Sequence, residues 1–418
     1  MRAPNFGPPI APRSWSVLPS LPPGLLASQP EAEGSEFTVM TYNLLADMLC
    51  TVEQFSSVNL AVLDWEYRRA LITREVQHHA PDILCLQELQ GNAAGEGVDD
   101  HHSAMRELLS KHGYDGVYIR KVKRTGVGWP RTQIGNAIFY RRGAFEYLAH
   151  EDVPIAVTLN ALCRADEASA AHFGRGAQVG LAVALRHRES GKPLVTVTTH
   201  LSCNFQEPWT QVAQVQTVLL AASRLAAMYG PQTAVVMGAD LNSIPGSGVY
   251  TLITEGYLPS SHPHLCIPGR SEPWAEKIQM PQFEDDPDAA STSGSGTKTG
   301  GAAYGGAGGD LYQPMLLTSA YKALLGGEPL FTNFTPSFIG TLDYIFGNAF
   351  VRPRRVLTLP DEDEVRKEGF LPAALYPSDH IYLLARFAFH KASGKRERVD
   401  DEGMPQDEDM PQAVATEE

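Results

Sequence analysis

Six short polar clusters in this sequence each stand at the end of an apolar, strand-like run. They are Tyr42–Leu44, Leu86–Leu89, Thr199–Leu201, Gly238–Ser243, Leu342–Ile345 and Ser378–His380. Loops at strand ends often carry catalytic groups. Taken singly, each cluster is more typical of a turn, a helix cap or a structural histidine. The argument for chemistry therefore comes from the whole set in its order: Asn, Glu, His, Asp-x-Asn, Asp and Ser-Asp-His.

This set matches the needs of phosphodiester hydrolysis. Such a reaction uses a hard cation with oxygen ligands, and Glu88 could supply one, with Asn43 beside it. It also needs a water molecule in line with the leaving oxygen. Asp240 could polarise that water, and Asn242 could help to hold the phosphoryl group.

Two histidines could stabilise the charge that develops on the phosphorus centre. His200 and His380 could do so as imidazolium ions or as hydrogen-bond donors. A histidine in this role is usually oriented by a carboxylate, and Asp343 is the natural partner for His380. Because no GxSxG nucleophile motif occurs, we expect direct attack by water.

The elements that position these clusters alternate between strands and helices, which predicts an α/β layered fold. The apolar pattern predicts helices over 65–79 and 209–228. It predicts strands over 37–44, 82–86, 137–140, 180–185, 194–198 and 234–237. We expect a catalytic domain over residues 36–389, preceded by a proline-rich irregular arm over 1–35. A Gly/Ser-rich insertion at about 280–308 and an acidic tail over 390–418 have compositions that cannot bury a core.

Composition argues against a disulfide-rich protein, a zinc protein and a membrane protein. Three short acidic stretches, 284–288, 361–364 and 400–418, together hold sixteen acids, which accounts for the net charge of −14. The charge therefore neither supports nor excludes a nucleic-acid substrate. The five cysteines form no CxxC pair, which disfavours a disulfide framework or a zinc site. No apolar run is long enough to predict a membrane span.

The sequence resembles the endonuclease/exonuclease/phosphatase superfamily, and within it the carbon-catabolite-repression-type deadenylases, the branch of nocturnin, the Angel proteins and 2′-phosphodiesterase. The matching stretches are Val39–Asp47, Ile83–Leu89, Gly113–Gly116, Gly135–Phe139, Thr199–Leu201, Met237–Tyr250, Phe331–Pro336, Asp343–Phe346 and Tyr376–Ile381. The resemblance implies a deoxyribonuclease-I-like fold, a two-layer β-sandwich flanked by helices.

The resemblance also implies roles for individual residues. Metal and catalytic positions of the family fall on Asn43, Glu88, His200, Asp240, Asn242, Asp343, Asp379 and His380. Phe338 occupies the position of an aromatic residue that stacks on adenine. Asn136 and Arg131 are further candidates for substrate binding. Pro208 is another, although its spacing after His200 differs from that in animal deadenylases.

The function that the resemblance implies is Mg²⁺-dependent 3′-to-5′ removal of poly(A) from mRNA, with Mn²⁺ as a substitute metal and 5′-AMP as product. The alternative is a 2′-phosphodiesterase or 2′-phosphatase acting on 2′-5′ oligoadenylate, a phosphorylated dinucleotide or cyclic-phosphate RNA ends. A third hypothesis is an inactive RNA-binding adaptor, which the complete catalytic set disfavours.

We expect RNA as the partner and no membrane. A deadenylase-complex scaffold is a further candidate partner, although no leucine-rich-repeat docking region is present. We expect the protein in the cytoplasm, with the nucleus as an additional site. The prolines of the arm disfavour an amphipathic organelle-targeting helix.

Overall fold

The structure is a computed structural model that describes residues 10–16, 35–91, 100–122, 131–162, 173, 176–267, 274 and 309–390. The expected insertion over 280–308 lies outside these residues, and so does the acidic tail apart from His390.

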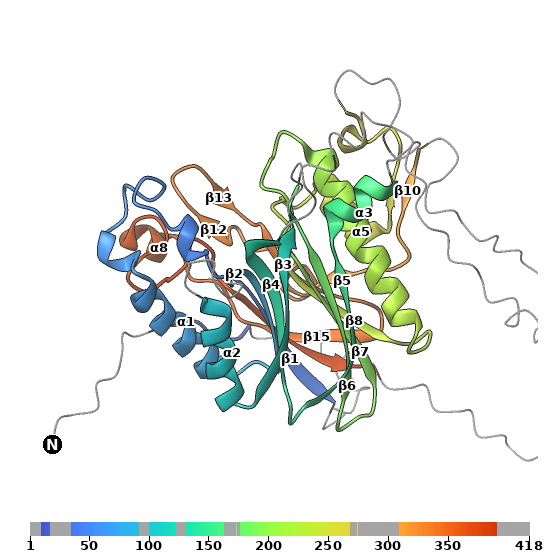
Figure 1. Ribbon diagram of the computed structural model, residues 1–418, viewed down its shortest axis with the longest axis horizontal. Helices are drawn as coiled ribbons and strands as arrows, with labels where there is room; N and C mark the ends of the chain where they lie inside the picture. Colours follow the sequence, from blue (N-terminus) through green and yellow to red (C-terminus); the bar gives the residue numbers. More distant parts are fainter. Residues whose placement is uncertain are drawn as a thin grey trace, which may run out of the picture.

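Two six-stranded sheets form the centre of the molecule (Figure 1). The order of strands in the first sheet is β15 (Val351–Val356), β16 (Leu383–Phe389), β1 (Glu36–Asn43), β2 (Ile83–Gln90), β4 (Arg131–Arg141) and β3 (Tyr114–Val122). The order in the second sheet is β11 (Thr318–Ser319), β14 (Asp343–Gly347), β8 (Ala234–Asp240), β7 (Pro193–Thr199), β6 (Gly180–His187) and β5 (Phe145–Val153). Two short hairpin-like pairs accompany them, β9 (Tyr257–Leu258) with β10 (Leu311–Tyr312) and β12 (Asn333–Phe334) with β13 (Ile339–Gly340).

Each large sheet has one parallel pair near its centre. Strand β1 runs parallel to β2 in the first sheet, and β7 runs parallel to β8 in the second. The remaining neighbours in these sheets are antiparallel. The strands of a parallel pair end at the same edge of a sheet. This arrangement gathers the residues that follow β1, β2, β7 and β8.

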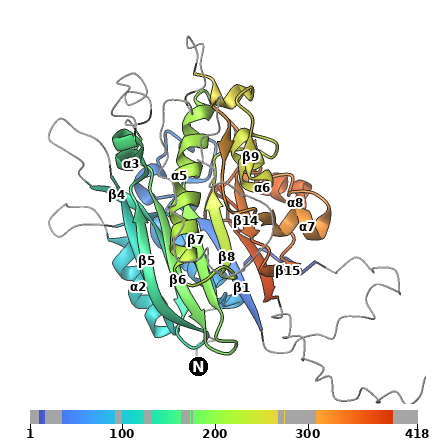
Figure 2. The same cartoon turned by 90° about the vertical axis from the view of Figure 1, so that its right-hand side faces the viewer.

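Seven helices are present among the described residues, and some of them cover the outer faces of the two sheets. They are α1 (Trp65–His79), α2 (His101–Lys111), α3 (Ile155–Leu162), α5 (Pro208–Ala227), α6 (Gly248–Glu255), α7 (Ala320–Leu325) and α8 (Glu362–Glu368), with 3₁₀ turns at Asp47–Leu49, Leu60–Val62 and Pro263–Leu265. Helices α1 and α2 lie on the first sheet, and α3 and α5 lie on the second (Figures 1 and 2).

Three apolar layers hold these elements together. The middle layer lies between the sheets and includes Phe37, Val183 and Val236. One outer layer packs α1 and α2 against the first sheet, and the other packs α5 against the second. The burial of apolar side chains on both faces of each sheet confirms the expected sandwich flanked by helices.

Most of the expected elements are present, with small changes in their ends. Helix α1 has the expected bounds, because Asp64 caps its first turn and Ala80, in the left-handed conformation, ends it before Pro81. Helix α5 begins one residue earlier than expected, at Pro208, since proline fits the first turn of a helix. No helix among the described residues is both long and apolar enough to cross a membrane.

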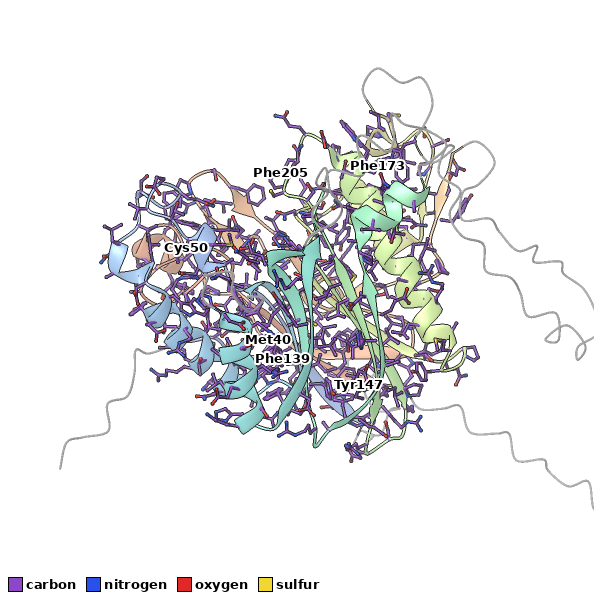
Figure 3. The ribbon with its side chains drawn as sticks, viewed as in Figure 1. Met40, Cys50, Phe139, Tyr147, Phe173 and Phe205 are labelled. Carbon is purple, nitrogen blue, oxygen red and sulfur yellow. The ribbon has the colours of Figure 1, made fainter. Side chains whose placement is uncertain are left out.

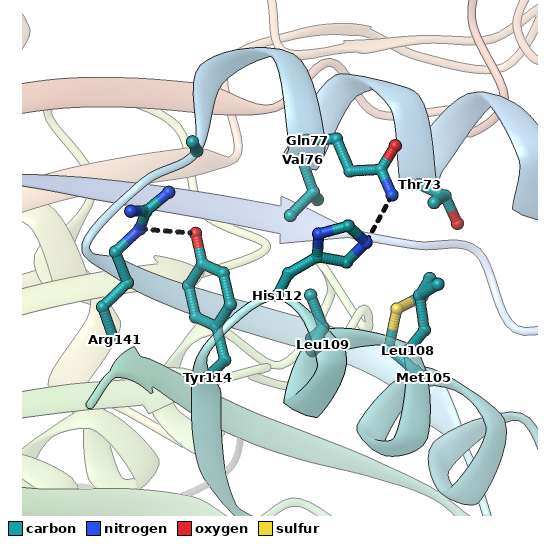
Figure 4. A pocket seen from close by; sticks show the side chains of 10 residues that line it. Thr73, Val76, Gln77, Met105, Leu108, Leu109, His112, Tyr114 and Arg141 are labelled. Atoms are coloured by element: carbon teal, nitrogen blue, oxygen red, sulfur yellow. Dashed lines mark hydrogen bonds between the residues drawn. The ribbon is translucent and has the colours of Figure 1, made fainter. Parts of the chain in front are cut away.

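A cavity of about 300 Å³ lies between α1 and α2 (Figure 4). Val76, Met105 and Leu109 form its apolar wall. A hydrogen bond of 2.8 Å between Gln77 Nε2 and His112 Nε2 closes one side. None of the six polar clusters lines this cavity.

Candidate active site

Three candidate residues lie side by side across the second sheet. Strand pairing places Asp240, the last residue of β8, opposite Asp343 at the start of β14. A parallel bridge places His200, just after β7, beside the same Asp240. Side chains of directly paired residues point to the same face of a sheet. The register of three strands therefore brings an imidazole and two carboxylates together.

The end of the first sheet faces this row. The side-chain amide of Asn43 donates a 2.9 Å hydrogen bond to Asp240 Oδ2. Glu88 lies at a bulge in β2 and has a positive φ of 56°, which is uncommon for a residue with a side chain. This bend lets Glu88 Oε2 accept from the backbone N–H of Ala46, while Oε1 lies 3.7 Å from His200 Nδ1.

The Ser378–His380 segment completes the group. Ser378 donates its hydroxyl to the carbonyl of Asn43 and accepts from the backbone N–H of His380. The Nδ1 atom of His380 lies 2.7 Å from Asp343 Oδ2, and its Nε2 atom lies 3.8 Å from Asp240 Oδ2. Thr332 donates to the same Asp343 oxygen at 2.6 Å, which fixes the carboxylate.

Asn242 folds back onto Asp240 through a turn. Its φ is 44°, a conformation that asparagine tolerates better than most residues. Its backbone N–H donates to Asp240 Oδ1 at 2.9 Å, and its side-chain amide donates to the carbonyl of Leu201. Both oxygens of Asp240 are thus held by hydrogen bonds from asparagines.

The two histidines have opposite electrostatic environments. Burial alone would lower the pKa of His380, but Asp343, Asp240 and Asp379 together raise it well above its usual value. Burial lowers the pKa of His200 well below its usual value, and the charges of Lys121 and His380 add to that effect. At neutral pH His380 is therefore an imidazolium ion and His200 is neutral.

The negative charge of the carboxylates around His200 and His380 is only partly balanced. Burial raises the pKa of Asp240, and the nearby Asp343 raises it further. Burial also raises the pKa of Asp379; His380 opposes that shift and Glu88 adds to it. The Oδ1 atom of Asp343 is buried and has no hydrogen-bond partner among the described residues. A cation would relieve this crowding.

The donor set fits a metal ion. Ligand atoms of Asp240, Asp343 and His380 lie within 4.8 Å of one another. However, His380 Nδ1 is engaged with Asp343 and the charged ring has no free lone pair, so the carboxylates and not the imidazole would bind the ion. Glu88 adds a further carboxylate, and its partner His200 is neutral. Carboxylate and amide oxygens are the ligands that hard divalent cations take.

The candidates for substrate binding have different placements. Phe338 lies half-buried in the turn between β12 and β13, and its ring stacks on that of Phe205, with centroids 5.6 Å apart and planes 18° apart. Figure 3 shows Phe205 beyond the ends of the strands. Sequence analysis missed Phe205, although it lies in the stretch after His200 where the proline spacing is unusual. Pro208 opens α5.

Asn136 differs from expectation. Its side chain is fully buried in β4 and donates a 2.9 Å hydrogen bond to the carbonyl of Val179, so it joins the two sheets. That burial leaves it no surface for direct contact with a substrate, and we correct the expectation accordingly. The backbone of Arg131 belongs to β4, but its side chain lies outside the described residues.

Lys121 lies among the catalytic candidates, a place that the sequence did not predict for it. Its Nζ atom lies 3.2 Å from His200 Nδ1, and its charge acts on Glu88 and Asp240. The residue belongs to β3, which ends beside the second sheet's row of polar side chains. In the sequence Lys121 belongs to a basic run with Arg120, Lys123, Arg124 and Arg131, which predicts contacts with an RNA backbone as readily as a solvated face.

Comparison with known proteins agrees with this geometry. The model of the endonuclease/exonuclease/phosphatase family matches residues 40–380, which hold all the residues described above. The chain belongs to this family. Curated relatives include carbon catabolite repressor protein 4 homolog 1 of Arabidopsis thaliana, 29% identical over 84% of this chain and 57% of the relative. Another is the CCR4-Not complex 3′-5′-exoribonuclease subunit Ccr4 of Neosartorya fischeri, 27% identical over 92% of this chain and 50% of the relative.

These relatives confirm the resemblance to the carbon-catabolite-repressor branch. The chain spans 57% of the length of the first and 50% of the length of the second. Solved structures show the same fold. A structure of ANGEL2, a 2′,3′-cyclic phosphatase, has a TM-score of 0.64 and 23% identity, and covers 90% of this chain and 98% of that chain. The human nocturnin catalytic domain has a TM-score of 0.52 and 23% identity, and covers 85% of this chain and 95% of that chain.

Proposed function

We propose that this member of the family is a Mg²⁺-dependent 3′-to-5′ exoribonuclease that removes poly(A) from RNA and releases 5′-AMP. The observation that carries the proposal is the contact of the charged pair Asp343–His380 with Asp240 at the edge where Asn43, Glu88 and His200 converge. The names of curated relatives, which include 3′-5′-exoribonuclease subunits, support the choice of reaction.

Glu88, with Asn43 beside it, would hold the metal ion. When bound, Mg²⁺ would polarise the phosphoryl group and neutralise part of its charge. The carboxylates described above are close enough to share in that balance, because ligand atoms of Asp240 and Asp343 lie within 4.8 Å of each other. Mn²⁺ has similar oxygen preferences and would substitute.

Asp240 would orient the attacking water. Two asparagines fix its carboxylate, since Asn43 binds one oxygen and the backbone of Asn242 binds the other. The imidazolium of His380 would stabilise the charge that develops on the phosphoryl oxygens, and Asp343 would keep that ring oriented. Neutral His200, 3.5 Å from Asp240, would donate or accept a hydrogen bond without adding charge.

The terminal base would stack on Phe338. Stacking on an aromatic ring contributes on the order of 1–3 kcal/mol per base and tolerates different sequences. The ring of Phe205 offers a second aromatic face beside it. Stacking therefore explains base binding, whereas preference for adenine would need further polar contacts.

A second candidate activity is hydrolysis of 2′-linked or cyclic phosphates at RNA ends or in small nucleotides. It is supported by the likeness to ANGEL2, whose solved chain this protein covers almost completely, at 98%. The same catalytic set would serve that reaction, because only the position of the scissile phosphate differs. The two candidates thus share a mechanism and differ in substrate.

A product assay separates these candidates. Purified protein with Mg²⁺ is given 5′-labelled RNA with an A-tail, the same RNA with a mixed-sequence tail, 2′-5′ oligoadenylate, a 2′-phosphorylated dinucleotide and RNA ending in a 2′,3′-cyclic phosphate. We expect stepwise shortening of the A-tail with release of 5′-AMP. An Asp240→Asn variant prepared in parallel controls for contaminating nucleases. Turnover of only the 2′-linked or cyclic substrates would replace the first proposal by the second.

A further inference from the structure

Arg68 is a buried arginine on α1. Its side chain reaches the sheet edge where Asn43, Glu88 and His200 converge, which we call the catalytic edge. Arg68 has no measurable exposure to solvent. Its Nη1 atom donates to the backbone carbonyls of Leu44 at 3.0 Å, Leu45 at 2.9 Å and Pro377 at 3.2 Å. One guanidinium group therefore joins two chain segments that are more than 300 positions apart in the sequence.

Both segments carry catalytic candidates. Leu44 and Leu45 directly follow Asn43, and the backbone N–H of Leu45 donates to the side-chain oxygen of Asn43. The next residue, Ala46, donates to Glu88. Pro377 directly precedes Ser378, which binds the carbonyl of Asn43. Arg68 thus lies behind the point where the Asn43–Glu88 group meets the His380 segment.

Packing alone does not explain an arginine at this place. Its Nη2 atom is 3.5 Å from Asp47 Oδ1, and the Asp47 side chain is 33% exposed, so its charge is only partly compensated. The Nε atom has no hydrogen-bond partner among the described residues. Burying a charge is costly, and an apolar side chain of similar volume often gives equal or greater stability. The three carbonyl contacts are what an apolar side chain could not supply.

We propose that Arg68 is a positioning residue for hydrolysis: it fixes the distance between the Asn43–Glu88 group and the Asp343–His380 pair. It touches neither substrate nor metal and acts through the backbone of the two segments. A planar guanidinium group suits this task, because its donors point in fixed directions, whereas a lysine carries a single point charge on a flexible chain. The proposal rests on the hydrolytic site described above but not on its preference for poly(A).

The expected effect is on rate and on local protection. Displacing catalytic groups by about 1 Å can cost on the order of 10²-fold in rate. We therefore expect Arg68→Met to lower kcat by roughly 10- to 100-fold, with KM changed by less than about threefold, and Arg68→Lys to retain part of the lost rate. The concentration of Mg²⁺ that gives half-maximal activity should rise.

Hydrogen exchange followed by mass spectrometry supplies a readout that does not depend on activity. In Arg68→Met, peptides that contain the amides of Leu45, Ala46 and His380 should exchange faster, because their side-chain acceptors lose their fixed positions. Peptides from β8 and α5 should exchange as in the wild type.

The matched control is Val76→Ala. Val76 is a buried residue on the same helix; it lines the cavity between α1 and α2 and has no polar group that could hold a backbone carbonyl. We expect it to lower Tm while leaving kcat, the Mg²⁺ response and exchange at the catalytic edge unchanged. If Arg68→Met does not fold, Arg68→Lys is compared with Val76→Ala in the same measurements.

Two results would overturn the proposal. One is wild-type kcat in a folded Arg68 variant. The other is faster exchange spread over the whole protein, with a rate defect that Val76→Ala reproduces at equal Tm. Both A-tailed RNA and a simple bis-aryl phosphodiester are used as substrates. If Arg68→Met loses exchange protection at the two segments while the wild type hydrolyses only the simple ester, the positioning role of Arg68 is supported and the poly(A) proposal is contradicted.

Discussion

Two buried carboxylates contact opposite faces of β1 and have different surroundings. Tyr42 and Asn43 are adjacent in this strand, so their side chains point to opposite faces. On the outer face, Tyr42 donates a 3.0 Å hydrogen bond to Glu75, and burial raises the pKa of Glu75 to about 8. On the inner face, Asn43 faces Asp240, which lies beside the Asp343–His380 pair.

The difference lies in what surrounds each carboxylate. Glu75 has a neutral phenol as its hydrogen-bond partner, and it avoids the cost of burial by keeping its proton. At the catalytic edge several carboxylates crowd together, and they raise the pKa of His380 well above its usual value. Burial alone therefore does not mark a functional site. The distinguishing features of the catalytic edge are several converging acids and a histidine that they hold in the charged form.

Metal removal is the strongest test of this contrast. We expect excess chelator to abolish hydrolysis, and Mg²⁺ or Mn²⁺ to restore it, because the acids that converge at the inner face are close enough to bind one cation. The metal should also raise Tm in the wild type, since a ligand that binds the native state stabilises it. Substituting Glu75 should leave both metal effects intact. Full turnover in excess chelator would refute the proposed hydrolase mechanism.

The Asp343–His380 pair should act as one unit. Asp343→Asn and His380→Ala should each lower kcat by on the order of 10²-fold or more, the scale of one lost electrostatic stabiliser. The double variant should be little worse than the worse single variant. Turnover and thermal unfolding are measured for all three. Additive losses in rate, or unfolding without a specific rate defect, would remove the pair from the mechanism.

Glu75 should affect stability and its pH dependence. The folded protein keeps the Glu75 proton up to about pH 8, whereas the unfolded chain loses it near the usual 4.5. Its contribution to stability is therefore full below about pH 4.5 and is lost as pH rises through about 8, at about 1.4 kcal/mol per unit of pKa difference. Glu75→Gln should flatten that slope in urea unfolding at pH 5 to 9. An unchanged slope would show that Glu75 is ionised in the folded protein.

Tyr42→Phe should give the smallest effect. It removes the hydroxyl that binds Glu75, and a lost hydrogen bond of this kind costs about 1 kcal/mol. Turnover should remain unchanged, although Asn43 is the next residue, because the ring points away from the catalytic edge. The midpoint of urea unfolding and kcat measured on the same preparation test this. A loss of kcat larger than the loss of stability would show that the two faces of β1 are coupled.

Much of the fold was predictable because the central strands are apolar throughout. Strand β8 is buried along its whole length, and its sequence gave a clear signal. Strand β5 was missed, since its buried residues, Phe145 and Val153, are separated by mostly exposed polar ones. An edge strand of this kind owes its conformation to pairing with β6, which local sequence does not reveal.

The candidate site was predictable where a residue directly follows a strand. The contact of Asp343 with His380 was expected from residue types and is present. Lys121 and Arg68 were not expected as parts of the site. Each lies inside a strand or helix, and its long side chain reaches the catalytic edge only when the layers of the fold have assembled. For Asn136, a family motif suggested a role in substrate binding but did not reveal that the side chain is buried between the sheets.

The pairing of β1 with β16 has a consequence for synthesis on the ribosome. The first strand of the first sheet lies beside the last one, and Glu36 is in register with Ala388. Until β16 has left the exit tunnel, the edge of β1 away from β2 is open, and His380 has not yet been placed next to Asp343. Because completion of the sheet and arrival of the imidazolium depend on the same final segment, we expect a nascent chain that stops before Ser378 to lack both the closed sheet and the proposed hydrolytic site.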